Sequence, residues 1–385
     1  MEHSDQCNEQ LRLCQIIASF SPRIGGAERA TERLCKELVN RGHNIDVVTT
    51  YYGGLPRHEV MHGFHVWRMG IGGPRFIRSA SYTIHSIAWI VLHSRRIQLF
   101  HTQNLDSPTL IAILSTLLTR HKWITTIHGE HHIPSRNKSI VGKLRLQLMK
   151  KLAVHYISIS TGVEQTLRDI GVRKHLISSI PNGLDLSIYT PIDIDTKHTL
   201  RRKYNLDIET PIILYLGRLI PSKNVALLLE ALRIIGNDNQ LSCLIVGDGN
   251  ERNRLEDICN SFKLNRCVRF VGMINDVIDY YHLSDIFVLP SLFEGLPVAL
   301  IEAMACGVAP IASECTGNLN IVRHGVTGLT FPINNAEALA SQLVDLLASS
   351  QLRTKLALNA RKHVEETYGI HNVATDHLKV YFQVL

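Results

Sequence analysis

Two positively charged side chains follow a short apolar run in the segment LYLGRLIPSKN, Leu214 to Asn224. The run predicts a buried strand that ends at Gly217, with Arg218 and Lys223 placed before or at the start of the next helix. The free N–H groups of a helix start attract anions, and two neighbouring cations add to that attraction. Arginine can hold a phosphate through paired hydrogen bonds, and lysine adds a mobile point charge. The segment predicts a phosphate-binding site, although two solvated loop cations would give the same pattern.

Two carboxylates occur in the segment LPSLFEGLPVALIEAMACG, Leu289 to Gly307. Glu294 and Gly295 are expected in a loop after a strand, and Pro297 suits the first turn of the following helix. Glu294 there can accept hydrogen bonds from sugar hydroxyls, or it can simply complement the helix dipole. Glu302 lies one to two turns into an otherwise apolar helix, where a carboxylate needs a polar partner. A ribose, with two adjacent hydroxyls, is one such partner.

A third segment, LIVGDGNERNRL, places Gly247 and Gly249 at the end of a strand. Glycines there let a ligand approach the backbone closely. Arg252 stands where the GxGxxG dinucleotide pattern requires its third glycine, so a nicotinamide-dependent dehydrogenase is disfavoured. Capping of the following helix by Asp248 is an alternative explanation for this segment.

The first half of the chain carries two further polar segments. In SPRIGGAER, Gly25 and Gly26 allow a tight turn after the first strand, and they either approach a ligand or form a plain strand-to-helix turn. In TTIHGEHH, His128 follows a predicted strand, where a polar side chain can reach a ligand. His131 and His132 follow it, but the spacing lacks the H-E-x-x-H pattern, so no metal site is predicted.

Short apolar runs alternate with amphipathic ones such as Ala27–Arg41, which favours βαβ units and parallel sheets. A polar segment with three prolines, Pro181–Pro211, predicts a linker region between two such domains. We therefore expect an α/β protein with two Rossmann-like, doubly wound domains facing an interdomain cleft, where strand-end residues carry the chemistry. The expected domains are residues 1–180 and 181–369, and a helix over 370–385 is expected to cross back to the first. The predicted strands are Leu11–Ser19, Ile45–Thr50, Leu99–Thr102, Trp123–Ile127, Tyr156–Ser160, Ile212–Leu216, Leu241–Val246, Val268–Phe270, Ile286–Leu289 and Val308–Ile311.

Composition limits the classes of function. The chain has 385 residues, a formal net charge of +7 and 45% apolar residues, which indicates a globular protein. No nucleic-acid-binding motif accompanies the positive charge, so no nucleic-acid partner is expected. The eight cysteines lack C-x-x-C spacing and favour buried, reduced thiols in the cytoplasm. The N-terminus lacks the apolar core of a signal peptide, and no run is apolar enough to span a membrane.

Basic residues concentrate in Arg136–Lys151, RNKSIVGKLRLQLMKK. The spacing places Leu144 and Leu148 on one face of a helix with lysines and arginines around it. Peripheral contact with the inner face of a membrane and the solvated face of an ordinary core helix both fit this pattern.

Taken together, these segments resemble the GT-B-fold retaining glycosyltransferases, also called glycosyl transferases group 1. The resemblance is strongest over Ile212–Pro332 and extends over most of the chain. Glu294 and Glu302 match the family's E-x7-E signature, and GRLIPSKN matches its phosphate-binding arginine and lysine. PNGLD, which begins at Pro181, matches the family's hinge motif, and GGAER matches its N-terminal glycine loop. A departure occurs at TGNLNIV, where Leu319 and Asn320 replace a proline and a glutamate that the family often shows.

The resemblance implies a role for each matching residue. Arg218 and Lys223 would bind the diphosphate of a nucleotide-sugar donor, Glu294 the transferred sugar and Glu302 the ribose, while His128 matches the family's active-site histidine. The remaining donor-binding positions would be Gly25, Gly26, Gly217, Gly247, Met273, Ile274, Gly295 and Leu296, with Met273 and Ile274 beside the base.

The implied enzyme is a hexosyltransferase that needs neither a metal nor another cofactor. It would retain the anomeric configuration while it moves a sugar, from UDP more often than from GDP, to a saccharide or lipid-linked acceptor in surface polysaccharide or glycoconjugate assembly. An epimerase of the same fold and a non-catalytic nucleotide-sugar-binding protein are the alternatives.

Overall fold

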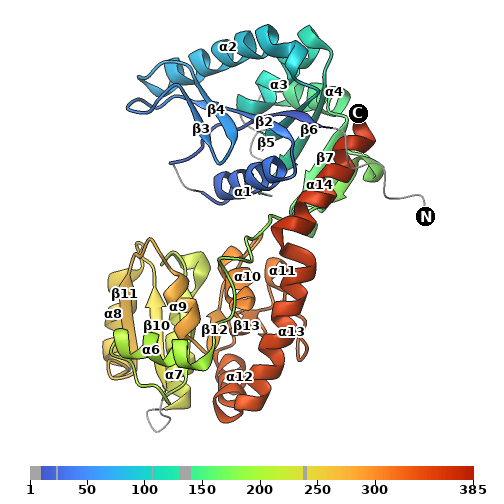
Figure 1. Ribbon diagram of the computed structural model, residues 1–385. Helices are drawn as coiled ribbons and strands as arrows, with labels where there is room; N and C mark the ends of the chain where they lie inside the picture. Colours follow the sequence, from blue (N-terminus) through green and yellow to red (C-terminus); the bar gives the residue numbers. More distant parts are fainter. Residues whose placement is uncertain (1–9, 23–24, 106, 130–139, 237–240) are drawn as a thin grey trace, which may run out of the picture. The chain divides into compact units, whose positions relative to one another are not determined.

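The computed structural model describes residues 10–22, 25–105, 107–129, 140–236 and 241–385. The chain divides into two compact units, and both combine helices with a largely parallel sheet (Figure 1). Unit 1 comprises Met1–Gly183 and Ile370–Leu385, and unit 2 comprises Leu184–Gly369. Each unit has a hydrophobic core of its own.

The described part of unit 1 contains an eight-stranded sheet in the order β3-β4-β2-β1-β5-β6-β7-β8, parallel except for β3. Its strands are β1 (Arg12–Ile16), β2 (Asn44–Thr50), β3 (His58–Met61), β4 (Phe64–Met69), β5 (Leu99–Gln103), β6 (Lys122–Ile127), β7 (His155–Ser158) and β8 (Ile177–Ser179). Its helices are α1 (Gly26–Asn40), α2 (Arg75–His93), α3 (Ser107–Thr119), α4 (Ile140–Leu152), α5 (Thr161–Asp169) and α14 (Ile370–Val384), with 3₁₀ turns η1 (Ser94–Arg96) and η4 (Lys174–Leu176). From β1, successive strands are added on one side up to β4, and from β5 onward they are added on the other side, so the strand order reverses between β1 and β5.

The last helix, α14, belongs to unit 1 although it follows unit 2 in the sequence (Figure 1). It packs against α1, where the Arg41 guanidinium donates hydrogen bonds to the His371 carbonyl and to Thr375 Oγ1. At its other end, Tyr381 is fully buried and its hydroxyl lies 2.8 Å from His101 Nδ1 in the sheet. These contacts join the chain's last segment to the core of its first domain.

Unit 2 contains a six-stranded, entirely parallel sheet in the order β11-β10-β9-β12-β13-β14. This is the strand order of a Rossmann fold, and it reverses between β9 and β12. The strands are β9 (Ile212–Leu216), β10 (Ser242–Val246), β11 (Val268–Gly272), β12 (Ile286–Leu289), β13 (Ala309–Ser313) and β14 (Leu329–Phe331). The helices are α6 (Ile194–Lys203), α7 (Val225–Ile235), α8 (Arg252–Ser261), α9 (Ile278–Leu283), α10 (Val298–Ala305), α11 (Thr316–Leu319), α12 (Ala336–Ala348) and α13 (Ser350–Tyr368), with the 3₁₀ turn η5 (Pro221–Lys223).

Apolar runs form the central strands of both units. In β9, the residues from Ile212 to Tyr215 are buried, as expected where helices cover both faces of a parallel sheet. The predicted strands coincide with observed ones to within a few residues, but β3, β4, β8 and β14 were not predicted. Strands β3 and β4 form an antiparallel hairpin rich in histidine, which gives no apolar run.

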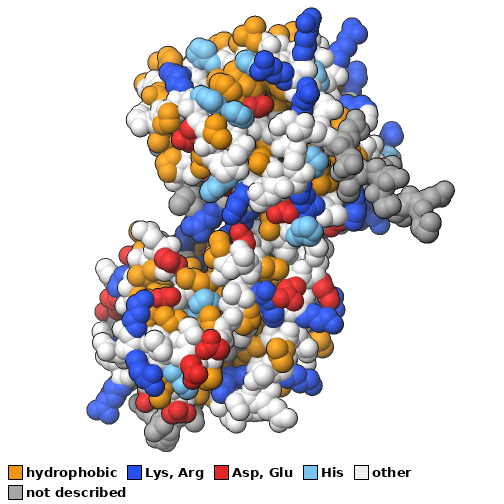
Figure 2. All heavy atoms as spheres, viewed as in Figure 1, with side chains coloured by type: hydrophobic (Ala, Val, Ile, Leu, Met, Phe, Trp, Pro, Cys, Tyr) orange, Lys and Arg blue, Asp and Glu red, His pale blue; other side chains and the backbone are white. Residues whose placement is uncertain are grey.

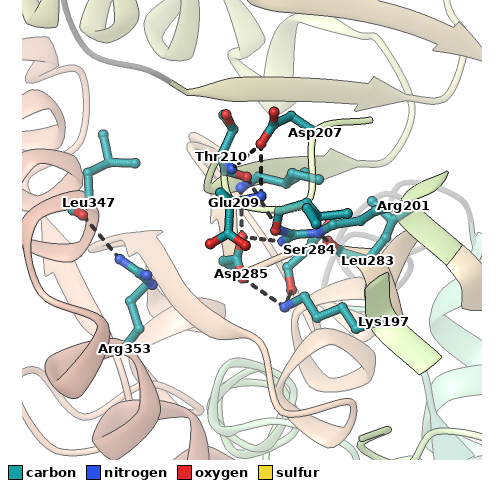
Figure 3. Close-up of polar contacts among 12 residues, drawn as sticks. Lys197, Arg201, Asp207, Glu209, Thr210, Leu283, Ser284, Asp285, Leu347 and Arg353 are labelled. Carbon is teal, nitrogen blue, oxygen red and sulfur yellow. Dashed lines mark hydrogen bonds and ion pairs between the residues drawn. The ribbon is translucent and has the colours of Figure 1, made fainter. Parts of the chain in front are cut away.

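The prediction of a linker over Pro181–Pro211 is wrong for its middle part, because residues 194–203 form helix α6. The sequence of α6 is polar, and a buried ionic network fixes it to unit 2 (Figure 3). The Asp285 carboxylate lies 2.7 Å from Lys197 Nζ and 2.6 Å from an Arg201 guanidinium nitrogen. Asp285 also accepts a hydrogen bond from the backbone N–H of Ile212, the first residue of β9. The network therefore supports the amino edge of the sheet.

Candidate active site

The loops after β9 and β12 meet at the position where the sheet of unit 2 reverses its strand order. Lys223 in the first loop places its Nζ atom 2.5 Å from Oε1 of Glu294 in the second. The Leu292 backbone N–H also donates a 2.8 Å hydrogen bond to the Ser222 carbonyl across the two loops. Ligands of open α/β sheets bind beyond the carboxyl ends of the strands at such a reversal. Two residues selected from the sequence thus lie at the edge where open α/β sheets generally bind ligands.

Short hydrogen bonds and a close glycine contact hold the Glu294 loop in place. Ser291 Oγ donates to Glu294 Oε1 at 2.6 Å, and Ser313 Oγ donates to the Ser291 carbonyl at 2.5 Å. Gly317 in α11 lies against the loop so closely that a Cβ atom there would be 2.3 Å from the Glu294 carbonyl oxygen. Only glycine fits this position without moving the loop. Oε2 of Glu294 has no hydrogen-bond partner among the described residues, so this oxygen can accept a hydrogen bond from a ligand.

Arg218 follows β9 with an exposed side chain, and its guanidinium has no hydrogen-bond or ion-pair partner among the described residues. Its backbone is fixed, because the Tyr215 hydroxyl donates a 3.0 Å hydrogen bond to the Arg218 carbonyl. Burial, with a contribution from the Glu294 carboxylate, raises the pKa of Tyr215 and keeps its hydroxyl protonated as a donor. The guanidinium is therefore carried on an ordered backbone and is available to an anion.

The glycines of the neighbouring loops have a packing role. A Cβ atom at Gly247 would lie 1.9 Å from the carbonyl oxygen of Gly217, and Gly247 has a φ of 135°. A Cβ atom at Gly249 would lie 2.1 Å from the Leu219 carbonyl oxygen. Glycine is thus required where the loops after β9 and β10 cross. Asp248 does not cap α8, whose N-cap residue is Glu251, so that alternative is wrong.

The remaining predicted positions of unit 2 surround the same edge. Met273 and Ile274 come directly after β11, and Met273 is 79% exposed, which is unusual for a large apolar side chain. Gly295 and Leu296 lie between Glu294 and the start of α10 and are partly buried.

Glu302 lies in α10 and is 4% exposed. The hydroxyl of Tyr281, itself fully buried on α9, donates a 2.9 Å hydrogen bond to Glu302 Oε2. Burial and the Glu302 carboxylate raise the pKa of Tyr281, so the phenol remains a donor. The sequence indicated that Glu302 needs a polar partner, and Tyr281 is one. It was missed because nothing in the sequence connects a tyrosine 21 positions earlier with Glu302.

Three predicted residues lie in unit 1 at the carboxyl edge of its sheet. Gly25 is the N-cap residue of α1, and a Cβ atom there would lie 2.3 Å from the Glu28 carboxylate. Gly26 begins the helix and would have open space around a Cβ atom. His128 follows the last residue of β6.

A hydrogen-bond chain fixes the His128 ring. Gln103, the last residue of β5, donates through Nε2 to Gln15 Oε1 at 2.9 Å, which leaves its own oxygen as the acceptor. That oxygen lies 2.7 Å from His128 Nε2, so Nε2 carries the proton and donates it. His128 Nδ1 is then a lone-pair acceptor, and it has no hydrogen-bond partner among the described residues.

The electrostatic environment keeps His128 neutral. Burial, with the nearby His377 ring as a second cause, lowers the pKa of His128 to about 4. At neutral pH the imidazole thus donates through Nε2 to Gln103, and its Nδ1 can accept a hydrogen bond. His128 and His377 also line a cavity of about 20 Å³, enough for a water molecule.

No group of three or more histidine, cysteine, aspartate or glutamate side chains suited to a metal ion occurs in the part of the chain that the structure describes. Glu130, His131 and His132 lie outside the described residues. No helix within the described ranges is both long and apolar enough to cross a bilayer.

Comparison with known proteins shows the family to which the chain belongs. The family model of glycosyl transferases group 1 matches residues 196–363, and that of glycosyltransferase family 4 matches residues 24–188. An uncharacterised glycosyltransferase of Haemophilus influenzae is 32% identical over 91% of this chain and 94% of its own length. The chain belongs to the group 1 glycosyltransferases.

Two other proteins refine the comparison. The Escherichia coli UDP-Gal:α-D-GlcNAc-diphosphoundecaprenol α-1,3-galactosyltransferase is 27% identical over 91% of each chain. The crystal structure of Anabaena HepE in complex with UDP has a TM-score of 0.79 and covers 97% of this chain and all of that one, with 19% identity. The two parallel-sheet domains thus have the GT-B fold, and the chain is a glycosyltransferase.

Proposed function

We propose that this enzyme moves a sugar from a nucleotide-sugar donor, with UDP as the nucleotide, to a saccharide or lipid-linked acceptor with retention of configuration. The observation that carries the proposal is the Lys223–Glu294 ion pair at the strand reversal, with the Arg218 guanidinium, which has no partner among the described residues, on the same edge. Two similar proteins support it: the Anabaena HepE structure contains UDP, and the Escherichia coli enzyme is a UDP-Gal:α-D-GlcNAc-diphosphoundecaprenol galactosyltransferase.

The proposed roles follow from charge. In the reaction, the bond between the anomeric carbon and the diphosphate oxygen breaks, and negative charge grows on the leaving diphosphate. Arg218 and Lys223 stabilise that charge, and because it is largest in the transition state, they accelerate the step. Backbone N–H groups at Gly295 and Leu296, beside the start of α10, add to this stabilisation.

The carboxylates and the strand-end residues position the donor. Glu294 accepts hydrogen bonds from the transferred sugar through its free oxygen, and Glu302 binds the ribose. Gly217 and Gly247 lie near the phosphates, and Met273 and Ile274 contact the base. In unit 1, we assign Gly25 and Gly26 to donor binding and His128 to catalysis, where its neutral Nδ1 accepts a hydrogen bond from a substrate hydroxyl.

Retention follows from a same-face substitution. Among the described residues, no side chain at this edge stands out as a covalent nucleophile, so we propose an oxocarbenium-like transition state. The acceptor oxygen bonds to the anomeric carbon on the face that the diphosphate leaves, and the acceptor proton passes to a diphosphate oxygen. The product glycoside then has the donor's anomeric configuration, which proton NMR of the product measures directly; an inverted product contradicts the mechanism.

Donor identity is tested by thermal shift. A ligand that binds only the folded state raises the unfolding temperature by mass action. UDP and UDP-sugars should raise it more than GDP-mannose or ADP-glucose at equal concentration. A larger shift with GDP-mannose would replace UDP by GDP in the proposal.

We propose further that the reaction needs no bound divalent metal, since Arg218 and Lys223 supply the positive charge at the diphosphate. Activity should survive EDTA, and a loss that only Mg²⁺ or Mn²⁺ reverses contradicts this part. An epimerase of the same fold would consume donor without an acceptor. Nucleotide release that depends on added acceptor distinguishes the transferase from it.

A lipid-linked acceptor would bring the enzyme to the inner, cytoplasmic face of a membrane. Unit 1 has an exposed apolar surface that can bind there. We define the α2–α3 face as the exposed apolar side chains of these packed helices: Phe76, Ile77, Ile84, Val91, Leu92, Leu110, Leu114, Leu117 and Leu118. Phe76 is 83% exposed and Leu92 is 80% exposed, so this is not a core face. Large apolar surfaces on soluble domains mark interaction sites.

Charge points to an anionic bilayer as the partner of the α2–α3 face. Helices α2, α3 and α4 contain no aspartate or glutamate, whereas arginines and lysines lie in and beside them. Hydrophobic and basic side chains lie next to each other over α2 in Figure 2. In the described part of α4, the exposed residues Lys143, Lys150 and Lys151 add further positive charge. Apolar insertion with surrounding cations is the pattern of interfacial membrane binding.

A further inference from the structure

A pocket of about 410 Å³ opens at the amino edge of the sheet in unit 1. It is lined by the first residues of β1 and β2, Arg12 and Asn44, and by residues of β4, α2 and η1. Strand carboxyl ends, where His128 lies, are at the other edge of the same sheet. The proposed donor and acceptor chemistry does not use this pocket, and its volume is in the range of small-molecule sites.

The wall of the pocket is aromatic. Trp67 and Trp89 both line it, with ring centroids 5.2 Å apart, and His93 stacks on Trp89 at 4.4 Å. His58 stacks on the Trp67 ring at 3.9 Å and also on the His65 ring at 5.3 Å. Five rings from β3, β4 and α2 therefore form one continuous cluster, in which the two indole planes are tilted by 43°. Indole rings present broad, rigid apolar surfaces with a polar N–H edge, and the C–H face of a pyranose sugar packs on such surfaces.

A hydrogen bond holds one side of this wall, and polar atoms on both sides remain for a ligand. Trp67 Nε1 donates to Asp46 Oδ1 at 2.7 Å, which fixes the indole and leaves the second carboxylate oxygen able to accept from a hydroxyl. Trp89 Nε1 is buried without a hydrogen-bond partner among the described residues. A buried donor without an acceptor is costly, and a ligand oxygen or a water would satisfy it.

The rim of the pocket is positively charged. The exposed guanidinium groups of Arg12 and Arg96 have no hydrogen-bond or ion-pair partner among the described residues, and His65 and His93 line the same pocket. Asp46 is the one carboxylate among the lining residues, and it already accepts the Trp67 N–H. An unpaired arginine beside aromatic rings binds a carboxylate or phosphate through a charge-assisted fork.

We propose that this pocket is a second ligand site that binds an acidic saccharide, a pyranose ring carrying a carboxylate or a phosphate. The sugar ring packs on Trp67 and Trp89, its hydroxyls bond to Asp46 and Asn44, and its anionic group lies between Arg12 and Arg96. The inference stands apart from the proposed transfer reaction, because it concerns other residues at the opposite edge of the sheet.

Intrinsic fluorescence tests the proposal, because Trp67 and Trp89 are two of the chain's three tryptophans. The third, Trp123, is fully buried in the sheet with its Nε1–H donated to Thr102, so it supplies a constant background. The full-length protein is titrated with methyl glucuronide, glucose 6-phosphate, neutral methyl glucoside and inorganic phosphate. The glucuronide and the sugar phosphate should change the emission with Kd values at least about tenfold lower than the neutral glucoside, the ratio given by one charge-assisted hydrogen bond.

Matched variants locate the binding. Arg12→Gln and Arg96→Gln should each raise the Kd for the acidic sugars by about tenfold or more, while Arg173→Gln, an exposed arginine elsewhere in unit 1, should not. Trp89→Phe should weaken binding of both acidic sugars and reduce the emission change. Raised salt should weaken the binding, since the charged rim is exposed.

Several results would overturn the proposal. Inorganic phosphate that binds as tightly as glucose 6-phosphate indicates an adventitious ion only. Neutral glucoside that binds as tightly as the glucuronide removes the role of the arginines. Unchanged Kd values in both arginine variants, or no emission change at about 10 mM ligand, where a millimolar Kd gives near-full occupancy, removes the site.

Discussion

Lys223 Nζ lies 2.5 Å from Glu294 Oε1, and this ion pair joins the two loops at the point where the sheet of unit 2 reverses its strand order. The sequence suggested one role for each residue, a phosphate ligand and a sugar ligand. The structure shows that each also holds the other in place. Lys223 is 19% and Glu294 8% exposed at the side chain, so the pair is largely shielded from solvent and its loss affects both loops.

The first prediction concerns the cations. Arg218→Ala and Lys223→Ala should each lower kcat by roughly 10²–10³, the usual cost of removing one transition-state donor. Because Lys223 is paired with Glu294, the double variant Lys223→Ala/Glu294→Gln should lose less than the product of the single losses. Steady-state kinetics with saturating acceptor measures the wild type, the single variants Arg218→Ala, Lys223→Ala and Glu294→Gln, and the double variant. Arg254→Ala, which removes an exposed arginine on α8, is the matched control and should stay near wild type. Full activity of both single variants would contradict the diphosphate assignment.

The second prediction separates the two carboxylates. Glu302→Gln should weaken binding of free UDP about tenfold or more, because charged hydrogen bonds contribute roughly 1.5–3 kcal/mol. Glu294→Gln should leave free UDP binding nearly unchanged but lower turnover of the intact donor. Calorimetric titration of UDP into each variant measures the affinity for the nucleotide, and steady-state kinetics with the intact donor measures the turnover.

Tyr281→Phe is the control for Glu302, because it removes the observed hydrogen bond to Glu302 Oε2 and leaves the carboxylate. It should cost about 1 kcal/mol of unfolding free energy and little UDP affinity. If Glu302→Gln binds UDP normally and only loses stability, the tyrosine contact is the whole role of this carboxylate.

The alternating apolar runs were sufficient to predict two parallel α/β domains, because central strands such as β9 are covered on both faces and must be continuously apolar. The same reasoning failed for β3 and β4, whose hairpin is polar and pairs histidine with tryptophan. It also failed for α6, which reads as a polar linker. Lys197 and Arg201 in α6 are held by Asp285, more than 80 positions later, and such distant ion pairs leave no local signal.

The position of strand-end residues was predictable, since parallel strands end at one edge, and Arg218, Lys223 and Glu294 do lie there. Their supporting contacts were not. Ser291, Ser313 and Gly317 hold the Glu294 loop through contacts between elements that are far apart in the sequence. Gln103 fixes the His128 tautomer in the same way. A pattern of residue types predicts the edge of the sheet at which a residue lies, but only the folded structure shows which residues contact it.

The third prediction concerns the α2–α3 face. The protein should sediment with vesicles of phosphatidylglycerol and phosphatidylcholine more than with phosphatidylcholine alone, and salt should weaken that binding. Leu92→Glu and Leu118→Glu should abolish it, since each places a charge where apolar insertion is expected. Leu358→Glu on α13, 66% exposed against 65% for Leu118, is the matched control and should bind as wild type. Equal loss in all three variants, or equal binding to both kinds of vesicle, would contradict the assignment.

The fourth prediction is a pH dependence of stability in unit 1. Burial lowers the pKa of both His128 and His377 to about 4, while an unfolded histidine titrates near 6.5. As pH falls from about 6.5 towards 4, these histidines bind protons in the unfolded chain but not in the folded chain. The free energy of unfolding therefore falls by about 1.4 kcal/mol per pH unit for each histidine. His377→Gln removes one titration, so its destabilisation relative to wild type should shrink as pH is lowered over this range. Urea unfolding followed by emission at several pH values measures the difference; a constant difference would contradict the prediction.

The last prediction concerns the ionic network at the opposite edge of unit 2 from the proposed site (Figure 3). Burial alone would raise the pKa of Asp285, but Lys197, Arg201 and the Ile212 N–H hold this pKa below its ordinary value. The ionised carboxylate therefore stabilises the folded state above about pH 4, and this stabilisation is lost as pH falls further. Asp285→Asn leaves the Arg201 guanidinium, 4% exposed, without a counter-charge and should lower the unfolding free energy by about 3–5 kcal/mol. Asp279→Asn removes a carboxylate paired with Lys203, which is 62% exposed, and should cost at most about 1 kcal/mol. Urea unfolding of both variants at neutral pH decides the point, because equal losses would show that Asp285 contributes no more than a surface ion pair.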